Sequence, residues 1–412
     1  MKIKNRLGTL PQALLLIGVM SSAATVRAQS VWEVVPQVSL SVHSNDNARL
    51  REAGDDSASF TRLDARVRLA TLTQNGNFFV EPRVRSDAQA DEEDKDLESD
   101  DWFLRVAGGY NWELASVGLR ANYSEESVWS SELVDATPDD PDVEDPIDTD
   151  TGRLVAIEQD RERLTVRPFI DFNLSDRSSL RLEARRIDVT YSEAELRGRT
   201  SFDDTLFAAG LVRRVDERNT VTARVFASEY NAVLNSNQTD TFGVQGTFSR
   251  PLTDIWNFAL EAGVQRSDFI FIEDGEVVDN ADSNFTFQLR FRRRTERLTT
   301  NIDFNRWVTP NAIGFVVQRT EVRAYALRRL TQRLQGSVGI RYAQTKSLDD
   351  VSTNDDRDYG RVEMGLEWEF ANDWSLDAGY QYTTQQFVNE ETAKSDSNAL
   401  WVRLSYSGSS RR

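Results

Sequence analysis

The sequence predicts an all-β fold: a transmembrane antiparallel up-and-down β-barrel of about 18 strands, within a range of 16–18, in a single domain. Three observations support this prediction. Apolar and polar residues alternate over most of the chain, turn residues recur at regular spacing, and short connections alternate with long polar ones. Because strand side chains point to opposite faces in turn, the alternation gives each strand one apolar and one polar face. A barrel with lipid outside and water inside needs that arrangement.

The segment 359–382 shows the alternation most clearly. Apolar side chains recur at every second residue from Val362 to Phe370, and again from Trp374 to Tyr382 after a break at Asn372-Asp373. Most candidate strands span about 9–11 residues, the length that a tilted strand needs to cross a bilayer. They begin near Pro36, Phe60, Phe78, Trp102, Val117, Arg163, Leu180, Asp204, Thr220, Thr241, Ile255, Asn284, Leu298, Thr320, Leu334, Tyr359, Trp374 and Ala399.

The connections fall into two kinds. Short ones lie at 74–77, 175–177, 216–219, 251–254, 295–297, 331–333 and 372–373. Longer polar ones lie at 44–58, 86–101, 124–158, 192–201, 231–239, 268–282, 346–358 and 384–397, with a shorter one at 309–314. Short periplasmic turns and long external loops are typical of bacterial outer-membrane barrels. The alternative of four-stranded propeller blades would require a polar exterior, which the apolar alternation from Trp256 to Val264 excludes.

The N-terminus has the features of a cleaved signal peptide. Lys2, Lys4 and Arg6 precede a short apolar stretch, and Val26-Arg27-Ala28 supplies small residues for cleavage after Ala28. We therefore expect a signal peptide at 1–28, a barrel at 29–406 and a short tail at 407–412. The chain lacks cysteine, which excludes a disulfide framework. Its mean hydropathy of −0.53 does not argue against a barrel, because only alternate residues face lipid.

The net charge of −18 is concentrated in two predicted external loops. Residues 86–101 hold nine acids and one lysine, and residues 124–158 hold twelve acids and one arginine. The second is too acidic and proline-rich to form a core of its own. It either extends into solvent or folds inward as a constriction. Asp148 and Asp150 match part of a calcium loop, but the later ligands are missing, so no metal or other cofactor is predicted.

Two residue types mark particular positions along the strands. Pro36, Pro82 and Pro168 interrupt alternating runs and are expected near the periplasmic strand ends, where a lost ladder hydrogen bond is tolerated. Aromatic residues at strand ends predict two interfacial girdles. The girdle residues are Trp112, Trp256, Phe370 and Trp374 beside short turns, and Trp102 and Trp307 toward long loops.

Arginine is abundant on the polar face. By parity, the lumen is predicted to contain Arg66, Arg68, Arg83, Arg85, Arg105, Arg120, Arg167, Arg181, Arg185, Arg224, Arg290, Arg292, Arg323, Arg341, Arg361 and Arg403. The acids predicted opposite them are Asp64, Glu81, Asp171, Glu183, Glu261, Asp303, Glu321, Glu363, Glu367, Glu369 and Asp377. Two interpretations stay open. The charges form an ion-pair lattice that stiffens the wall, or the excess of arginine selects anionic solutes.

Enzymatic activity has little support in the sequence. The single histidine, His43, lies near Ser41, Ser44 and Asp46 at a strand-to-loop junction, where such residues are common. We expect no enzyme and no nucleic-acid partner.

Several segments resemble the beta-barrel porin 2 family of outer-membrane barrels. They are the opening segment VWEVVPQVSLSVHSNDNARL and the turns SRPLTDIWNF, RRLTQRLQGS and EFANDWSLDAGYQY, and the resemblance covers most of residues 31–406. Members of that family occur beside exopolysaccharide production genes, so the resemblance implies a role in polysaccharide passage.

The sequence thus predicts a barrel in the outer membrane of a Gram-negative bacterium. The leading hypothesis is a porin-like conduit for anionic solutes or a secreted polysaccharide, and the alternative is a closed structural or adhesive barrel. In the alternative, the acidic external loops bind ions or lipopolysaccharide. The alternating strand Leu400 to Tyr406 predicts recognition by the barrel-assembly machinery, and lipid and lipopolysaccharide are the expected surroundings.

Overall fold

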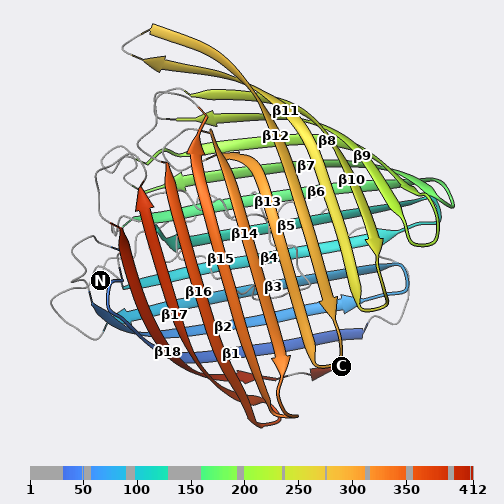
Figure 1. The fold of residues 1–412 in the computed structure, drawn as a ribbon. Helices are drawn as coiled ribbons and strands as arrows, with labels where there is room; N and C mark the ends of the chain where they lie inside the picture. The colour runs from blue at the N-terminus through green and yellow to red at the C-terminus, as the bar shows by residue number, and fades with distance from the viewer. Residues whose placement is uncertain are drawn as a thin grey trace, which may run out of the picture.

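The chain forms a closed antiparallel β-barrel of 18 strands in one domain (Figure 1). The computed structural model describes residues 31–48, 50, 57–89, 98–128, 159–192, 199–233, 237–273, 276–310, 316–348, 356–387, 394–408 and 410–411. Among these residues, no helix is long and apolar enough to cross a membrane. The predicted signal peptide and the two aspartates Asp148 and Asp150 lie outside the described residues.

The strands run in chain order around the wall. Their bounds are β1 Val31–Asn45, β2 Ala58–Leu72, β3 Gly76–Gln89, β4 Ser99–Asn111, β5 Ala115–Ser127, β6 Asp160–Ser175, β7 Ser178–Tyr191, β8 Phe202–Arg214, β9 Thr220–Ala232, β10 Gln238–Pro251, β11 Trp256–Glu273, β12 Glu276–Arg294, β13 Leu298–Pro310, β14 Val316–Arg329, β15 Leu334–Ser347, β16 Arg357–Ala371, β17 Trp374–Phe387 and β18 Ser395–Ser407. All eighteen predicted strands are confirmed. Their lengths were underestimated, because the shortest have 13 residues and β12 has 19.

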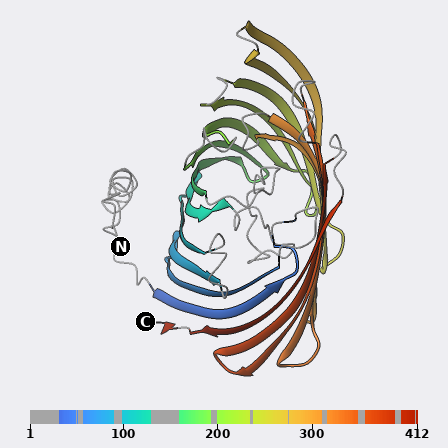
Figure 2. The ribbon, with the colours of Figure 1, turned by 90° about the vertical axis from the view of Figure 1, so that its left-hand side faces the viewer.

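The barrel closes where the first strand meets the last (Figure 2). Residues 37–45 of β1 pair with residues 399–407 of β18. The tail then contributes a two-residue strand, β19 Ser410–Arg411, which pairs with Val34 and Glu33 of β1. Ser410 and Arg411 of the predicted tail therefore extend the closing ladder.

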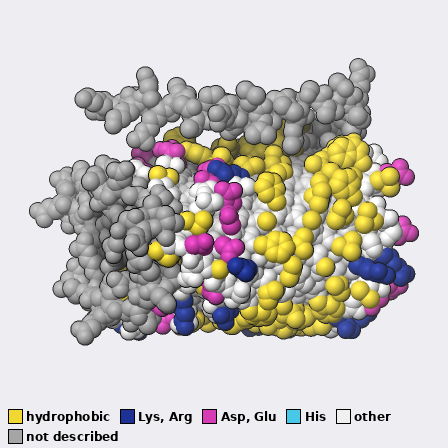
Figure 3. All heavy atoms as spheres, turned by 90° about the horizontal axis from the view of Figure 1, so that it is seen from above, with side chains coloured by type: hydrophobic (Ala, Val, Ile, Leu, Met, Phe, Trp, Pro, Cys, Tyr) yellow, Lys and Arg dark blue, Asp and Glu magenta, His cyan; other side chains and the backbone are white. Residues whose placement is uncertain are grey.

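The outer face of the wall is apolar. Val38, Leu40 and Val42 of β1 are exposed, as are Leu400, Val402 and Leu404 of β18, while their neighbours in sequence point inward. Figure 3 shows a broad hydrophobic area on the wall, with charged side chains grouped to either side of it. This alternation follows from the period of two in a strand, and it leaves the polar set of every strand for the lumen.

The two ends of the barrel differ in their connections. At one end, here the short-turn end, neighbouring strands are joined by two to five residues, such as Asn372-Asp373 between β16 and β17. The other end is the long-loop end. The predicted polar loop at 268–282 is wrong, because β11 and β12 pair along this segment up to Glu273 and Glu276. Its aspartates and asparagines lie on both faces of the paired hairpin.

Two of the three prolines lie nearer the middle of their strands than predicted. Pro82 is the seventh residue of β3, and Pro168 is the ninth residue of β6. The β2–β3 ladder passes from Arg66–Arg83 directly to Leu69–Val80, and the β6–β7 ladder omits Arg167 and Pro168. A proline lacks the N–H that a ladder needs, so each proline interrupts the ladder on one side only.

The predicted outer girdle also needs a correction. Trp102 is exposed on the outer face, as are Trp112 and Trp374 at the short-turn end. Trp307 belongs instead to the inward-facing residues of β13, since it stands in register with the inward Arg319 of β14. The parity of β13, read from Ile302 and Phe304, already places Trp307 in the lumen.

Three lumen glycines each lie under an aromatic ring on the neighbouring strand. Gly118 faces Phe169, Gly243 faces Phe226 and Gly379 faces Trp401, in each case as a register pair. A Cβ added at Gly379 would meet Trp401 Cζ2 at 2.3 Å and the Met364 carbonyl oxygen at 2.8 Å. These glycines provide the space that the rings occupy, as in other curved sheets.

Gly379→Ala is therefore expected to destabilise the barrel by about 1–3 kcal/mol, because overpacking displaces the indole or the backbone. Equilibrium unfolding in urea in detergent micelles measures the effect, and the emission of Trp401 reports on the displaced ring. Gly246→Ala is the matched control, since an added Cβ there meets its nearest neighbour at 4.0 Å. Equal stability of the two variants would contradict the assignment.

Candidate functional site

The inward residues of the wall form the candidate site. Strand register places all the arginines predicted for the lumen on this face; in β14–β16, for example, Arg323, Arg341 and Arg361 stand abreast. Further arginines toward the long-loop end share the inward parity although they were not predicted for the lumen: Arg62, Arg161, Arg163, Arg319 and Arg357. The strands that carry Arg161, Arg319 and Arg357 begin earlier in the chain than the sequence suggested.

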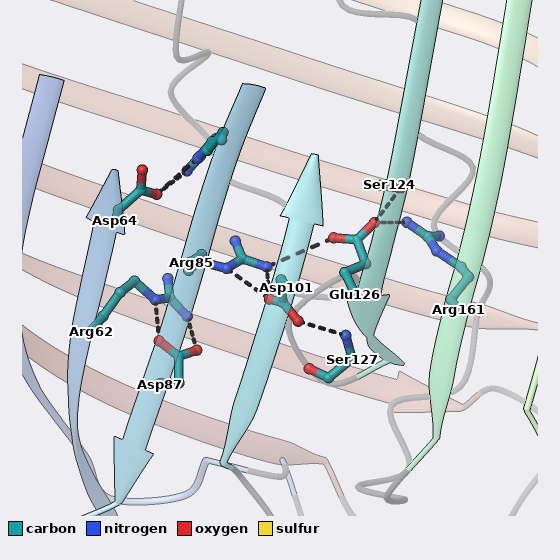
Figure 4. A network of polar contacts seen from close by, with 10 residues as sticks. Arg62, Asp64, Arg85, Asp87, Asp101, Ser124, Glu126, Ser127 and Arg161 are labelled. Carbon is teal, nitrogen blue, oxygen red and sulfur yellow. Dashed lines mark hydrogen bonds and ion pairs between the residues drawn. The ribbon is translucent and has the colours of Figure 1, made fainter. Parts of the chain in front are cut away.

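Many of these arginines are held by carboxylates, several of them on neighbouring strands (Figure 4). Arg62 of β2 donates to both oxygens of Asp87 of β3, at 2.7 and 2.8 Å. Arg85 of β3 donates to Asp101 of β4 at 2.6 Å. Such paired, bidentate contacts fix both partners, so these arginines stabilise the wall of the barrel.

The same lattice continues across β5 and β6. Arg161 of β6 donates to Glu126 of β5 at 2.7 Å, and Glu126 also lies 3.7 Å from Arg85. The backbone N–H of Ser127 donates to Asp101 at 2.9 Å. Asp87, Asp101 and Glu126 were predicted to belong to acidic external loops, but they lie in strands β3, β4 and β5. They share the parity of Arg83 and Arg85, which is the signal that identifies them as counter-ions.

A second cluster lies on β14 and β15. Glu321 accepts from Arg323 at 2.7 Å and from Arg341 at 3.1 Å, and it lies 3.2 Å from Arg319. The side chains of Glu321 and Arg341 are each 1% exposed. One carboxylate therefore serves three guanidinium groups in a place from which solvent is excluded.

Arg120 and Arg167 form a pair of facing arginines. They stand directly opposite each other on β5 and β6, and neither forms an ion pair with any residue that the structure describes. Arg163 and Arg185 lie close to Arg167. Arg185 is paired with Asp204 at 2.5 Å, and Glu183 is bound by Arg224. Like charges opposite each other destabilise a sheet. Placing these two arginines face to face therefore costs stability, and no ion pair of the lattice offsets this cost.

The environment of the two side chains suits an anion. Arg120 is exposed on the inward face, so its guanidinium is accessible from the lumen. The Nε atom of Arg167 is buried and has no hydrogen-bond partner among the described residues. The Nε–H of a buried guanidinium is a strong donor that is costly to leave unpaired. A carboxylate or phosphate between the two strands would satisfy both groups.

The lumen is also partly filled by apolar side chains at the long-loop end. Ile187, Val189 and Tyr191 of β7, Phe202 of β8 and Tyr230 of β9 all have inward parity and are almost fully buried. The parity of the strands also places these apolar residues inward, although only charged residues were predicted for the lumen from the sequence. The polar part of the lumen is therefore confined to the part of the wall between this cluster and the short-turn end.

His43 is on the inward face of β1. Its ring stacks on Phe60 at 4.7 Å with an interplanar angle of 2°, and its Nε2 lies 2.8 Å from Ser41 Oγ. These contacts hold the imidazole flat against β2. Within the described part of the chain, no group of three or more acids, histidines or cysteines is arranged to hold a metal ion.

Comparison with known proteins gives structural neighbours alone. No family model matches the chain, and no curated protein matches it. Among solved structures, OccAB1 of Acinetobacter baumannii is 11% identical with a TM-score of 0.47, covering 94% of this chain and 99% of its own. OccK2 (OpdF) of Pseudomonas aeruginosa, solved in complex with glucuronate, is 13% identical with a TM-score of 0.47, covering 92% and 98%. Similarity at this level says nothing about the solute of the present barrel.

Proposed function

We propose that the protein is an outer-membrane barrel that conducts anionic solutes through its lumen. The apolar exterior requires a lipid surrounding, and a closed ladder leaves no backbone edge around most of the wall to be solvated. The observation that carries the choice of solute is the Arg120–Arg167 pair, because it supplies positive charge to the lumen without a fixed counter-ion. Arg66, Arg68 and Arg292 also lack an ion pair with any described residue, but they do not face one another across neighbouring strands. Many of the other arginines are paired with acids and contribute less to selectivity.

A passing anion can be stabilised at this pair without being trapped. Arg120 is accessible from the lumen, whereas Arg167 is half-buried and flanked by Arg163 and Arg185. An arginine presents a planar fork that matches a carboxylate or phosphate. The resemblance to the beta-barrel porin 2 family implies the passage of a polysaccharide, and a polysaccharide that carries carboxylates presents such groups at regular intervals.

The double variant Arg120→Gln with Arg167→Gln tests the proposal. The ratio of chloride to potassium permeability, measured from the reversal potential of a planar bilayer, is expected to fall roughly threefold, most strongly at low salt where screening is weak. Arg266→Gln with Arg186→Gln is the matched control, because it removes the same charge from side chains on the outer face. Unchanged selectivity in the lumen variant would contradict the proposal.

A closed barrel is the second candidate, and one observation favours it. The apolar cluster of β7, β8 and β9 occupies the long-loop end of the lumen. The same recording separates the two candidates, because a closed barrel gives no steady conductance. Absence of conductance from the full chain, and also after deletion of residues 130–152, would establish the closed form.

A further inference from the structure

The boundary between β12 and β13 differs from the other boundaries in the wall. Pairing between them stops at Phe287–Arg306, although β11 and β12 remain paired to Glu276 and β13 and β14 remain paired to Pro310. Residues 276–286 of β12 and 307–310 of β13 thus have no partner across this boundary. Figure 1 shows the β11–β12 hairpin diverging from β13 toward the long-loop end. We call this divergence the fork.

Side chains close the fork in place of the backbone. Gln318 Nε2 donates across the fork to Asn284 Oδ1 at 3.0 Å. On the β13–β14 side of the fork, Arg306 Nη2 donates to Gln318 Oε1 at 2.7 Å and so positions this amide. Asn284 has inward parity on β12, whereas Gln318 has outward parity on β14. Their contact therefore means that the inner face of the hairpin overlaps the outer face of β14.

Apolar contacts support the same overlap. Val308 of β13 and Val316 of β14, both of outward parity, pack into the cluster that includes Phe269 on the inner face of β11. In Figure 2 the orange ends of β13 and β14 lie inside the curve of the β11–β12 hairpin. The ends of β13 and β14 are thus turned into the lumen, and the hairpin covers them from outside.

The base of the fork contains polar groups without partners. Thr286 is 5% exposed and Asn305 is 8% exposed, and the Oγ1 atom of Thr286 and the Oδ1 atom of Asn305 have no hydrogen-bond partner among the described residues. The same holds for Nε1 of Trp307. A hydroxyl, an amide and an indole N–H carry no charge but can donate to or accept from the hydroxyl groups of a sugar. These groups differ from the arginines of the lattice, which suit carboxylates.

The height of the fork on the wall is also informative. Phe285 is exposed, and the outward residues beyond it on β12, Ser283, Ala281 and Asp279, are small or polar. The fork therefore begins where the apolar band ends. An opening at this level leads sideways from the lumen to the outer edge of the membrane.

We propose that the fork is a lateral gate for a hydroxyl-rich chain, that is, a glycan. The β11–β12 hairpin swings away from β13 and β14 when the Asn284–Gln318 contact breaks, and Thr286, Asn305 and Trp307 then meet the glycan at the opening. No backbone ladder has to break for this motion, because the ladder already stops at Phe287. The glycan route rests on the proposed conducting lumen, whereas the motion of the hairpin does not.

Thiol labelling tests the motion in a chain that has no cysteine of its own. Thr286→Cys is expected to react slowly with a fluorescent maleimide, and Gln318→Ala added to it to raise the rate at least tenfold. Thr239→Cys is the matched control, since Thr239 is also 5% exposed and lies in the intact β10–β11 ladder. Gln318→Ala should leave its rate unchanged. Equal acceleration at both positions, or none at Thr286→Cys, would overturn the gate.

A cross-link tests the glycan. Asn284→Cys with Gln318→Cys, bridged by a short bifunctional thiol reagent, holds the fork closed. A neutral linear glucan oligosaccharide is expected to interrupt the chloride current of the unbridged barrel, and bridging should abolish these interruptions while leaving the chloride current unchanged. Identical interruptions before and after bridging would refute the glycan route. A barrel without any current would refute the proposed conduction instead, and the labelling result would still decide the gate.

Discussion

Glu321→Ala is expected to lower the free energy of unfolding by about 5 kcal/mol, because removal of one partner from a buried ion cluster leaves the others uncompensated. Three guanidinium groups depend on this carboxylate, those of Arg319, Arg323 and Arg341. Those of Arg319 and Arg341 are at most 2% exposed and cannot be reached by water without opening the wall. Unfolding in guanidinium chloride, followed by tryptophan fluorescence of the micelle-folded barrel, measures the loss.

The control for this substitution is Glu261→Ala. Glu261 also has inward parity, and its hydrogen bond comes from Thr247 Oγ1 at 3.1 Å, with no arginine on it. The free energy of unfolding is expected to fall by about 1 kcal/mol there, which is the usual contribution of one hydrogen bond from a neutral donor. Similar losses at the two positions would show that the cluster around Glu321 does not hold the wall together.

Asp101→Ala is expected to cost about 3 kcal/mol, for a related reason. Asp101 is 1% exposed, and it accepts from Nε and Nη2 of Arg85 and from the backbone N–H of Ser127. Arg85 keeps a second carboxylate, Glu126, at 3.7 Å, so the loss is smaller than at Glu321. The shift in electrophoretic mobility between folded and heat-unfolded barrel, followed against temperature, shows the lower stability.

The neighbouring Asp100 provides the control for Asp101. Asp100 points to the outer face, where it accepts from Ser86 Oγ at 2.7 Å in an exposed contact. Asp100→Ala is expected to change stability by no more than about 0.5 kcal/mol. An unfolding temperature at Asp101→Ala equal to that at Asp100→Ala would argue against the lattice as a source of stability.

The strand order and the facing of side chains follow from the sequence because period-two alternation is local. The starts of β9, β13, β15 and β17 at Thr220, Leu298, Leu334 and Trp374 were predicted to the residue. The strand ends at the long-loop side were not. Asp87 and Asp101 stand within a run of acids, and composition alone cannot separate those that face an arginine across the wall from those that face solvent.

The sequence predicted the inward arginines of the candidate site, but it did not predict which of them are paired with acids and which are not. Parity places Arg120 and Arg83 on the same face, but only register shows that Arg83 lies 2.6 Å from Asp64 whereas Arg120 faces Arg167. The fork could not be predicted either. Residues 279–284 of β12 are small or polar on both faces, so the sequence assigned most of them to a loop. Pairing depends on contacts between distant segments, which one sequence does not specify.

The two central prolines have a consequence for the width of the channel. Pro82 interrupts the β2–β3 ladder and Pro168 interrupts the β6–β7 ladder, so the four strands from β3 to β6 form a panel that is tied less firmly at mid-height than at its ends. Such a panel can curve inward or outward at mid-height while its two ends stay in place. Arg167 lies in the second interruption. In the proposed conducting barrel, the curvature of this panel would therefore set the clearance beside Arg120 and Arg167.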